Sequence, residues 1–111
     1  MRGEDRVRLR HKVEAAEELA GFLQGHSQAD FEGNRLLLFA VIRSIEVFGE
    51  AASRISPEAR AANPQLPWSD MVAMRNRLIH GYFDIDARIV WKTATEEIPA
   101  LLPLIRSLCE A

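Results

Sequence analysis

The chain has 111 residues, of which 48% are hydrophobic and 27% are charged, and its formal net charge is −2. This length fits one domain over residues 1–111 and is too short for two separate cores, while the apolar share excludes a disordered chain. The slightly acidic balance excludes a protein that coats nucleic acid with a basic surface. Any nucleic-acid binding must therefore come from a local site.

The sequence carries no sign of export, membrane insertion or a metal site. No window reaches the ~18 uncharged apolar residues of a membrane span, and the N-terminal segment lacks the apolar stretch of a secretory signal. We therefore expect a cytoplasmic protein without membrane contact. One cysteine excludes an intramolecular disulfide, and one cysteine with three histidines argues against structural zinc. That cysteine, Cys109, is expected to be inert.

The spacing of apolar residues predicts helices, and no alternating strand pattern is found. Ser27 followed by Asp30 is typical of a helix start, because the serine oxygen can accept from a free backbone N–H. The expected elements are a helix over 5–23, a helix start at 27–30, an apolar run over 31–55, a short helix over 57–63, a turn at 63–67, a helix over 68–79, a helix over 86–97, and a last apolar face over 101–108. Pro99 and Pro103 are expected to break or restart that last pattern. The fold class is all-α, a bundle of four or five helices.

The run over 31–55 is apolar around much of its circumference. A helix with so wide an apolar surface must bury two faces. In so short a chain, one face can serve the core and the other a partner subunit. We therefore expect a homodimer.

The helix over 68–79 places a charge on an apolar stripe. At 3.6 residues per turn, Arg75 lies in the middle of the stripe that includes Trp68 and Met71. An unpaired charge is costly there. Either Arg75 pairs with a buried carboxylate, with Glu46 and Glu50 as candidates, or the stripe opens onto a wet cleft where the guanidinium holds an anion.

His80 follows five residues after Arg75 and directly before Gly81, which is well placed to end the helix. At a last helical turn the dipole favours the imidazolium form, which suits a proton donor or a phosphate clamp. The alternative is a histidine that caps free carbonyl groups. The same spacing also occurs from Arg6 to His11, so spacing alone does not decide.

The segment over 75–83, R-N-R-L-I-H-G-Y-F, resembles the R-N-x-x-x-H-x-Y signature of the HepT-like branch of HEPN domains. The likeness covers nearly the whole chain, with further matches at 49–52, 67–68, 84–86 and 90–91. These small helical proteins are toxins encoded beside a minimal nucleotidyltransferase antitoxin. The Arg6 to His11 match lies outside the position of the family motif and is interpreted as accidental.

The resemblance implies the toxin of a type VII-like HEPN/nucleotidyltransferase pair, a metal-independent endoribonuclease without a cofactor. Two R-x4-H motifs would line one cleft at the interface of a HEPN-like homodimer that binds RNA. Arg75 would hold the scissile phosphate, Asn76 would orient it, and His80 would transfer protons. Arg77, near the motif, is a candidate for a further phosphate contact, as is Arg88. The product would be a 2′,3′-cyclic phosphate or its hydrolysis product.

The resemblance also implies that the partner antitoxin adenylylates Tyr82. AMP at that position would compete with RNA beside Arg75 and His80. Tyr82 could instead be an ordinary core residue with its hydroxyl at the rim. The alternative function is a non-catalytic nucleotide-binding or adaptor subunit of a nucleotidyltransferase complex.

The N-terminal segment carries five cations that could guide RNA toward the cleft. We favour a solvated helix face instead, because Arg10 and Glu14 have ion-pair spacing and nearby acidic residues dilute the charge. The five residues are Arg2, Arg6, Arg8, Arg10 and Lys12.

Overall fold

The computed structural model describes residues 1–79 and 85–110, except for the side chains of Arg75, Leu78 and Ile79. Within these ranges the chain forms helices and loops and no strand, which confirms the all-α prediction. In chain order the elements are α1 (Gly3–Leu23), α2 (Gln28–Glu32), α3 (Arg35–Ser53), α4 (Pro57–Ala62), α5 (Trp68–Ile79), α6 (Ala87–Lys92), the π-helix η1 (Thr93–Glu97) and α7 (Ile98–Glu110).

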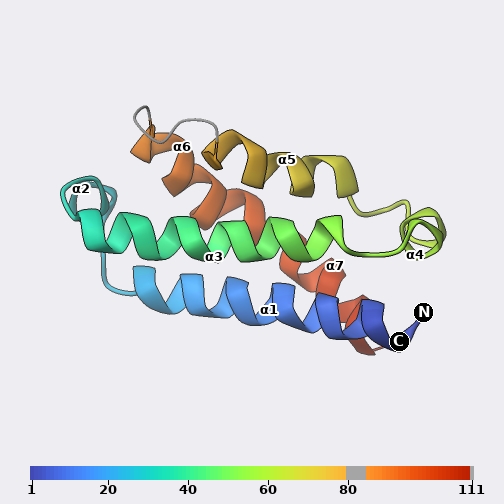
Figure 1. Cartoon of the computed structure of the whole chain (residues 1–111). Helices are drawn as coiled ribbons and strands as arrows, with labels where there is room; N and C mark the ends of the chain where they lie inside the picture. The colour runs from blue at the N-terminus through green and yellow to red at the C-terminus, as the bar shows by residue number, and fades with distance from the viewer. Residues whose placement is uncertain (80–84, 111) are drawn as a thin grey trace.

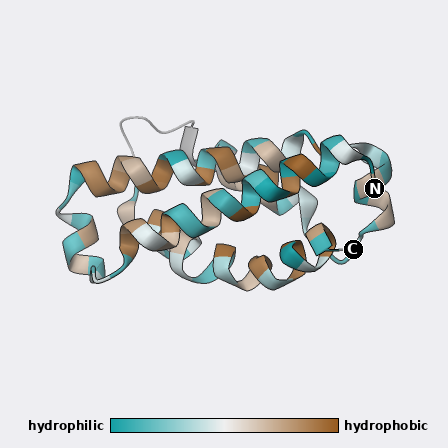
Figure 2. Ribbon diagram, turned by 90° about the horizontal axis from the view of Figure 1, so that it is seen from below, coloured by the Kyte–Doolittle hydropathy of each residue, from teal (hydrophilic) through white to brown (hydrophobic). Residues whose placement is uncertain are grey.

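Helix α3 is the centre of the bundle. It packs against α1 on one side and α5 on the other, while α7 packs mainly against α1 (Figure 1). Hydrophobic and hydrophilic residues are interspersed along each helix, which is the pattern of amphipathic helices (Figure 2). The fully buried side chains come from several helices and form one core: Leu9, Leu19, Phe31, Val41, Ile45, Phe48, Ile55, Met71, Val90, Ile98 and Ile105.

Side-chain caps begin both α2 and α3. Ser27 and Asp30 form the reciprocal pair expected at a helix start: the Asp30 N–H donates to Ser27 Oγ at 3.1 Å, and the Ser27 N–H donates to the Asp30 carboxylate at 3.0 Å. Asn34 then caps α3, since its side-chain oxygen accepts from the Leu37 N–H at 3.1 Å. The apolar run predicted over 31–55 is therefore divided at Gly33 and Asn34, because this cap begins a new helix.

The prolines near the C-terminus, which are predicted to break or restart the helical pattern, do not interrupt α7. Pro99 and Pro103 both lie within α7, and the irregularity falls before them, in η1. There the Ile98 N–H donates to the Thr93 carbonyl oxygen five residues back, which is the π-helical register. Because Pro99 has no N–H for the carbonyl of residue 95, an α-helical register cannot close completely at this turn.

Two charged side chains of α1 are buried, and each is satisfied by one neighbour. The Asp5 carboxylate accepts from the Ser56 N–H at 2.9 Å and from its hydroxyl at 2.7 Å, which ties the start of α1 to the start of α4. Burial by itself would raise the pKa of Asp5, but these hydrogen bonds lower it below its ordinary value.

Lys12 is fully buried between α1 and α3. Its Nζ donates to the Phe48 carbonyl oxygen at 2.8 Å and lies 3.5 Å from the centroid of the Phe48 ring. Burial lowers the pKa of Lys12 to about 7. The prediction of a solvated face is therefore wrong for Lys12, because the long side chain turns into the core and satisfies its amine there.

Candidate functional site

The helix that carries the motif is firmly anchored at its N-terminal end. The Trp68 indole N–H donates to the Asn63 carbonyl oxygen at 2.9 Å, and the Met71 N–H donates to the Pro67 carbonyl oxygen at 3.0 Å. Met71 and Met74 are buried, with 0% and 4% of their surface exposed. The helix has the predicted bounds of 68–79, and it packs against α3.

The predicted catalytic pair is described only in part. Arg75 lies in α5, one turn after Met71, and its side chain is outside the described residues, as are His80 and Tyr82. Glu46 and Glu50, the carboxylates considered as partners of Arg75, each contact an arginine of α3 or of its C-terminal end. Glu46 lies 3.4 Å from Arg43, and Glu50 accepts from Arg54 Nε at 2.8 Å. The roles of Arg75, His80 and Tyr82 stay predictions.

The two supporting residues of the motif are exposed. Asn76 lies on the surface, and Arg77 Nη2 lies 3.5 Å from Glu97 Oε2 of η1. Arg88 contacts Asp86 at 3.4 Å, at the start of α6. The contact with Glu97 directs Arg77 toward the turn between α6 and α7. Sequence spacing could not reveal this contact, because 20 residues separate Arg77 from Glu97.

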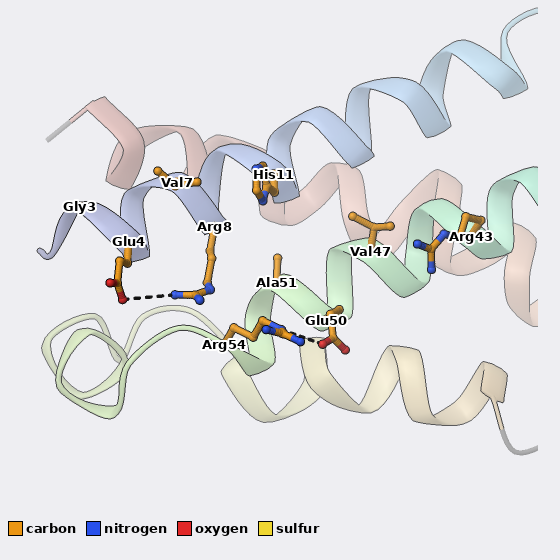
Figure 3. A pocket seen from close by; sticks show the side chains of 10 residues that line it. All are labelled: Gly3, Glu4, Val7, Arg8, His11, Arg43, Val47, Glu50, Ala51 and Arg54. Carbon is orange, nitrogen blue, oxygen red and sulfur yellow. Dashed lines mark hydrogen bonds and ion pairs between the residues drawn. The ribbon is translucent and has the colours of Figure 1, made fainter.

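A groove of about 800 Å³ lies between α1 and α3 (Figure 3). Its floor is apolar, and its rim carries charges of both signs that pair locally: Arg8 with Glu4 at 3.9 Å, and Arg54 with Glu50 at 2.8 Å. The lining residues are Gly3, Glu4, Val7, Arg8, His11, Arg43, Val47, Glu50, Ala51 and Arg54. This groove depends on how α1 crosses α3, and no sequence motif indicated it.

A second groove, of about 530 Å³, lies on α5 itself. It is lined by Pro67, Asp70, Ala73, Met74, Arg77, Glu97 and Leu101. It therefore joins the motif helix to η1 and to the first turns of α7.

The described ranges hold neither a metal-binding cluster nor a membrane-spanning helix. Across 1–79 and 85–110, histidine, cysteine and acidic side chains do not gather into a group of three or more that could hold a metal ion. None of the helices described has both the length and the apolar character that a bilayer crossing requires. Burial raises the pKa of the half-buried Cys109 thiol, which disfavours the reactive thiolate.

Comparison with known proteins identifies the family. The model of the family "Ribonuclease HepT-like" matches residues 13–108. A protein of Thermococcus cleftensis named "Probable ribonuclease HepT" is 40% identical over 89 residues, which cover 80% of this chain and 81% of that protein. Two further relatives carry the name "Putative RNase". The relative from Methanocaldococcus jannaschii is 37% identical over 89 residues, which cover 80% of this chain and 82% of that protein. The relative from Caldanaerobacter subterraneus is 34% identical over 102 residues, which cover 92% of this chain and 91% of that protein.

No solved structure matches the chain. The family match nevertheless includes α5 and both elements that border its groove. With its helical architecture and relatives of similar length, the chain belongs to the HepT-like ribonuclease family, whose members are RNA-cleaving enzymes.

Proposed function

We propose that this ribonuclease is a metal-independent endoribonuclease toxin with Arg75 and His80 as its catalytic residues. The supporting observation is that the motif begins on a helix anchored by Trp68 and Met71, while Asn76 and Arg77 on the same helix are open to solvent. The helix can thus hold an arginine at a fixed place, and RNA can reach the residues beside it.

RNA supplies its own nucleophile, so the protein has only to move protons and stabilise charge. A base takes the proton of the 2′-hydroxyl, whose oxygen forms a bond to phosphorus while the bond to the 5′-oxygen breaks. An acid returns a proton to that leaving oxygen, giving a 2′,3′-cyclic phosphate and a 5′-hydroxyl. His80 fits the proton transfers, and the always-charged, planar guanidinium of Arg75 fits the charged phosphate.

Purified protein should cut single-stranded RNA in excess EDTA and leave cyclic phosphate ends. Strict dependence on added Mg²⁺ or Mn²⁺ would contradict metal independence. Tight nucleotide binding without cleavage of any RNA would instead favour the non-catalytic adaptor.

A homodimer would bring two histidines to one cleft, enough for a base and an acid. The outer face of α3 supports this part of the proposal, because Leu36 is 85% exposed and Phe39 is 46% exposed. Apolar side chains that are exposed together on one helix face are typical of a surface to which another protein subunit binds.

A charge on this face should prevent dimer formation. We expect Leu36→Glu to be monomeric by light scattering at micromolar concentration, whereas the native protein is dimeric. Leu104→Glu is the matched control, because Leu104 is also an exposed leucine but belongs to α7 and not to α3. A native protein that is monomeric at the same concentration would contradict the dimer.

Adenylylation of Tyr82 by a partner nucleotidyltransferase is the proposed regulation. Coexpression with that antitoxin should raise the intact mass by AMP units, and Tyr82→Phe should abolish the gain. The added phosphate would bring negative charge beside the site that binds the RNA phosphate, so cleavage should fall with the extent of modification. A mass gain that persists in Tyr82→Phe would place the modification elsewhere.

A further inference from the structure

The groove on α5 exists because two neighbouring helices have different main partners. Helix α5 packs against α3, whereas α7 packs mainly against α1. Asp70, Ala73 and Arg77 recur at helical spacing along one side of α5, and Glu97 and Leu101 are one turn apart on the opposite wall. The volume of about 530 Å³ lies within the range of small-ligand sites.

The walls of the groove combine an apolar floor with a polar rim. Pro67, Ala73, Met74 and Leu101 give a surface on which a flat ring can lie. The rim carries the guanidinium of Arg77 and the carboxylates of Asp70 and Glu97. Two negative charges and one positive charge disfavour a phosphate in this groove and favour a neutral group with hydrogen-bond donors.

The ion pair at the rim is open to a ligand. Arg77 and Glu97 are 3.5 Å apart, longer than a well-formed charge-assisted hydrogen bond, and their side chains are 50% and 32% exposed. So exposed a pair contributes little to stability. The pair does place the N–H donors of the Arg77 guanidinium beside the two carboxylate oxygens of Glu97.

We propose that this groove binds a guanine base of the RNA substrate, an assignment that rests on the proposed ribonuclease function. Guanine presents the acceptors O6 and N7 next to the donors N1–H and N2–H₂, which matches Arg77 beside Glu97. Asp70 supplies a further acceptor on the same rim. Adenine has no N1–H donor and no O6 acceptor, so it offers Arg77 and Glu97 one hydrogen bond each where guanine offers each of them two.

One residue of the groove, Arg77, is close in sequence to the proposed catalytic residues. Arg77 lies inside the motif, two residues after Arg75 and three before His80. Two residues of an α-helix turn by about 200°, so positions 75 and 77 lie on opposite sides of α5, and a base held at Arg77 belongs to a nucleotide across the helix from the scissile phosphate. Single-stranded RNA suits this recognition, since its unstacked bases expose their hydrogen-bonding edges. The groove would select where the enzyme cuts.

Binding of mononucleotides tests the site without any cleavage. In calorimetric or NMR titrations, guanosine monophosphate should bind more tightly than adenosine monophosphate, and Glu97→Gln should weaken guanosine binding by about 10- to 100-fold. Glu96→Gln is the matched control, because Glu96 is the exposed neighbour in η1 and does not line the groove. Equal affinity for both nucleotides, or equal effects of the two substitutions, would overturn the proposal.

Cleavage of oligonucleotides that differ at one base separates this inference from the proposed function. We expect cuts at a fixed distance from a guanine in the native protein and loss of that preference in Glu97→Gln, with cutting still detectable. Cleavage without a guanine preference would overturn the base site and leave the ribonuclease function intact. Selective guanosine binding without cleavage of any RNA would do the reverse.

Discussion

Replacing His80 with alanine is expected to lower the rate of RNA cleavage by about 10²–10⁴, the range that a positioned general acid or base contributes. The imidazole is the proposed proton-transfer group, and alanine leaves water to replace it. Arg75→Ala should lower the rate by about 10²–10³, because a donor that stabilises charge in the transition state is lost. Lysine at 75 should restore little of this, since an ammonium lacks the planar fork.

These rates are to be measured with a defined RNA in excess chelator, with circular dichroism as the check on folding. His26→Ala is the control, because this exposed histidine lies in the loop after α1 and its imidazole is 3.9 Å from the Asp30 carboxylate of α2. If His80→Ala cuts RNA as fast as His26→Ala, the assignment of His80 is wrong.

Replacing Lys12 with methionine is expected to stabilise the protein near neutral pH, by about 1–4 kcal/mol. Methionine fills similar apolar space and carries no charge into the core, while the Phe48 carbonyl keeps its position inside α3. The gain should depend on pH, because the pKa of Lys12 falls from 10.5 to about 7 on folding. Below pH 7 both states hold the proton, and the folded protein bears the full cost of the buried charge.

Between pH 7 and 10.5 only the unfolded state holds this proton, so the native protein gains stability as the pH rises. The variant lacks this slope, and the difference in the free energy of unfolding should shrink toward pH 10.5. Urea denaturation at several pH values measures it. Lys92→Met, at the exposed lysine of α6, should show no such trend. A Lys12→Met protein less stable than native at pH 6 would show that the buried charge stabilises the fold.

Structural features that depend on residues close together in the sequence could be predicted. The start of α5 follows from Pro67 and Trp68, and the Ser27 and Asp30 cap was visible as a spacing of three residues. Both depend on groups within one turn of each other. The cap at Asn34 is also local, yet the strong apolar pattern over 31–55 concealed it, since hydrophobic periodicity continues across the break.

Features that depend on tertiary packing could not be predicted. The burial of Lys12 requires knowledge that Phe48, 36 residues later, lies opposite it. The Arg77 to Glu97 contact depends on where the π turn places Glu97. For the candidate site, the motif from Arg75 to Tyr82 could thus be found by comparison of local pattern, whereas the grooves that would give it specificity could not.

In the proposed guanine site, the π turn at η1 separates the choice of base from the proposed catalytic residue Arg75 on α5. A π turn holds one more residue than an α-helical turn, so it rotates the helix after it relative to the helix before it. Here α6 packs against α2 and α3, and α7 against α1, although the helical run between them is unbroken. Loss or gain of one residue in this turn would present a different side chain to Arg77 and leave α5 untouched. Relatives that share the motif could in this way diverge in the RNA they cut.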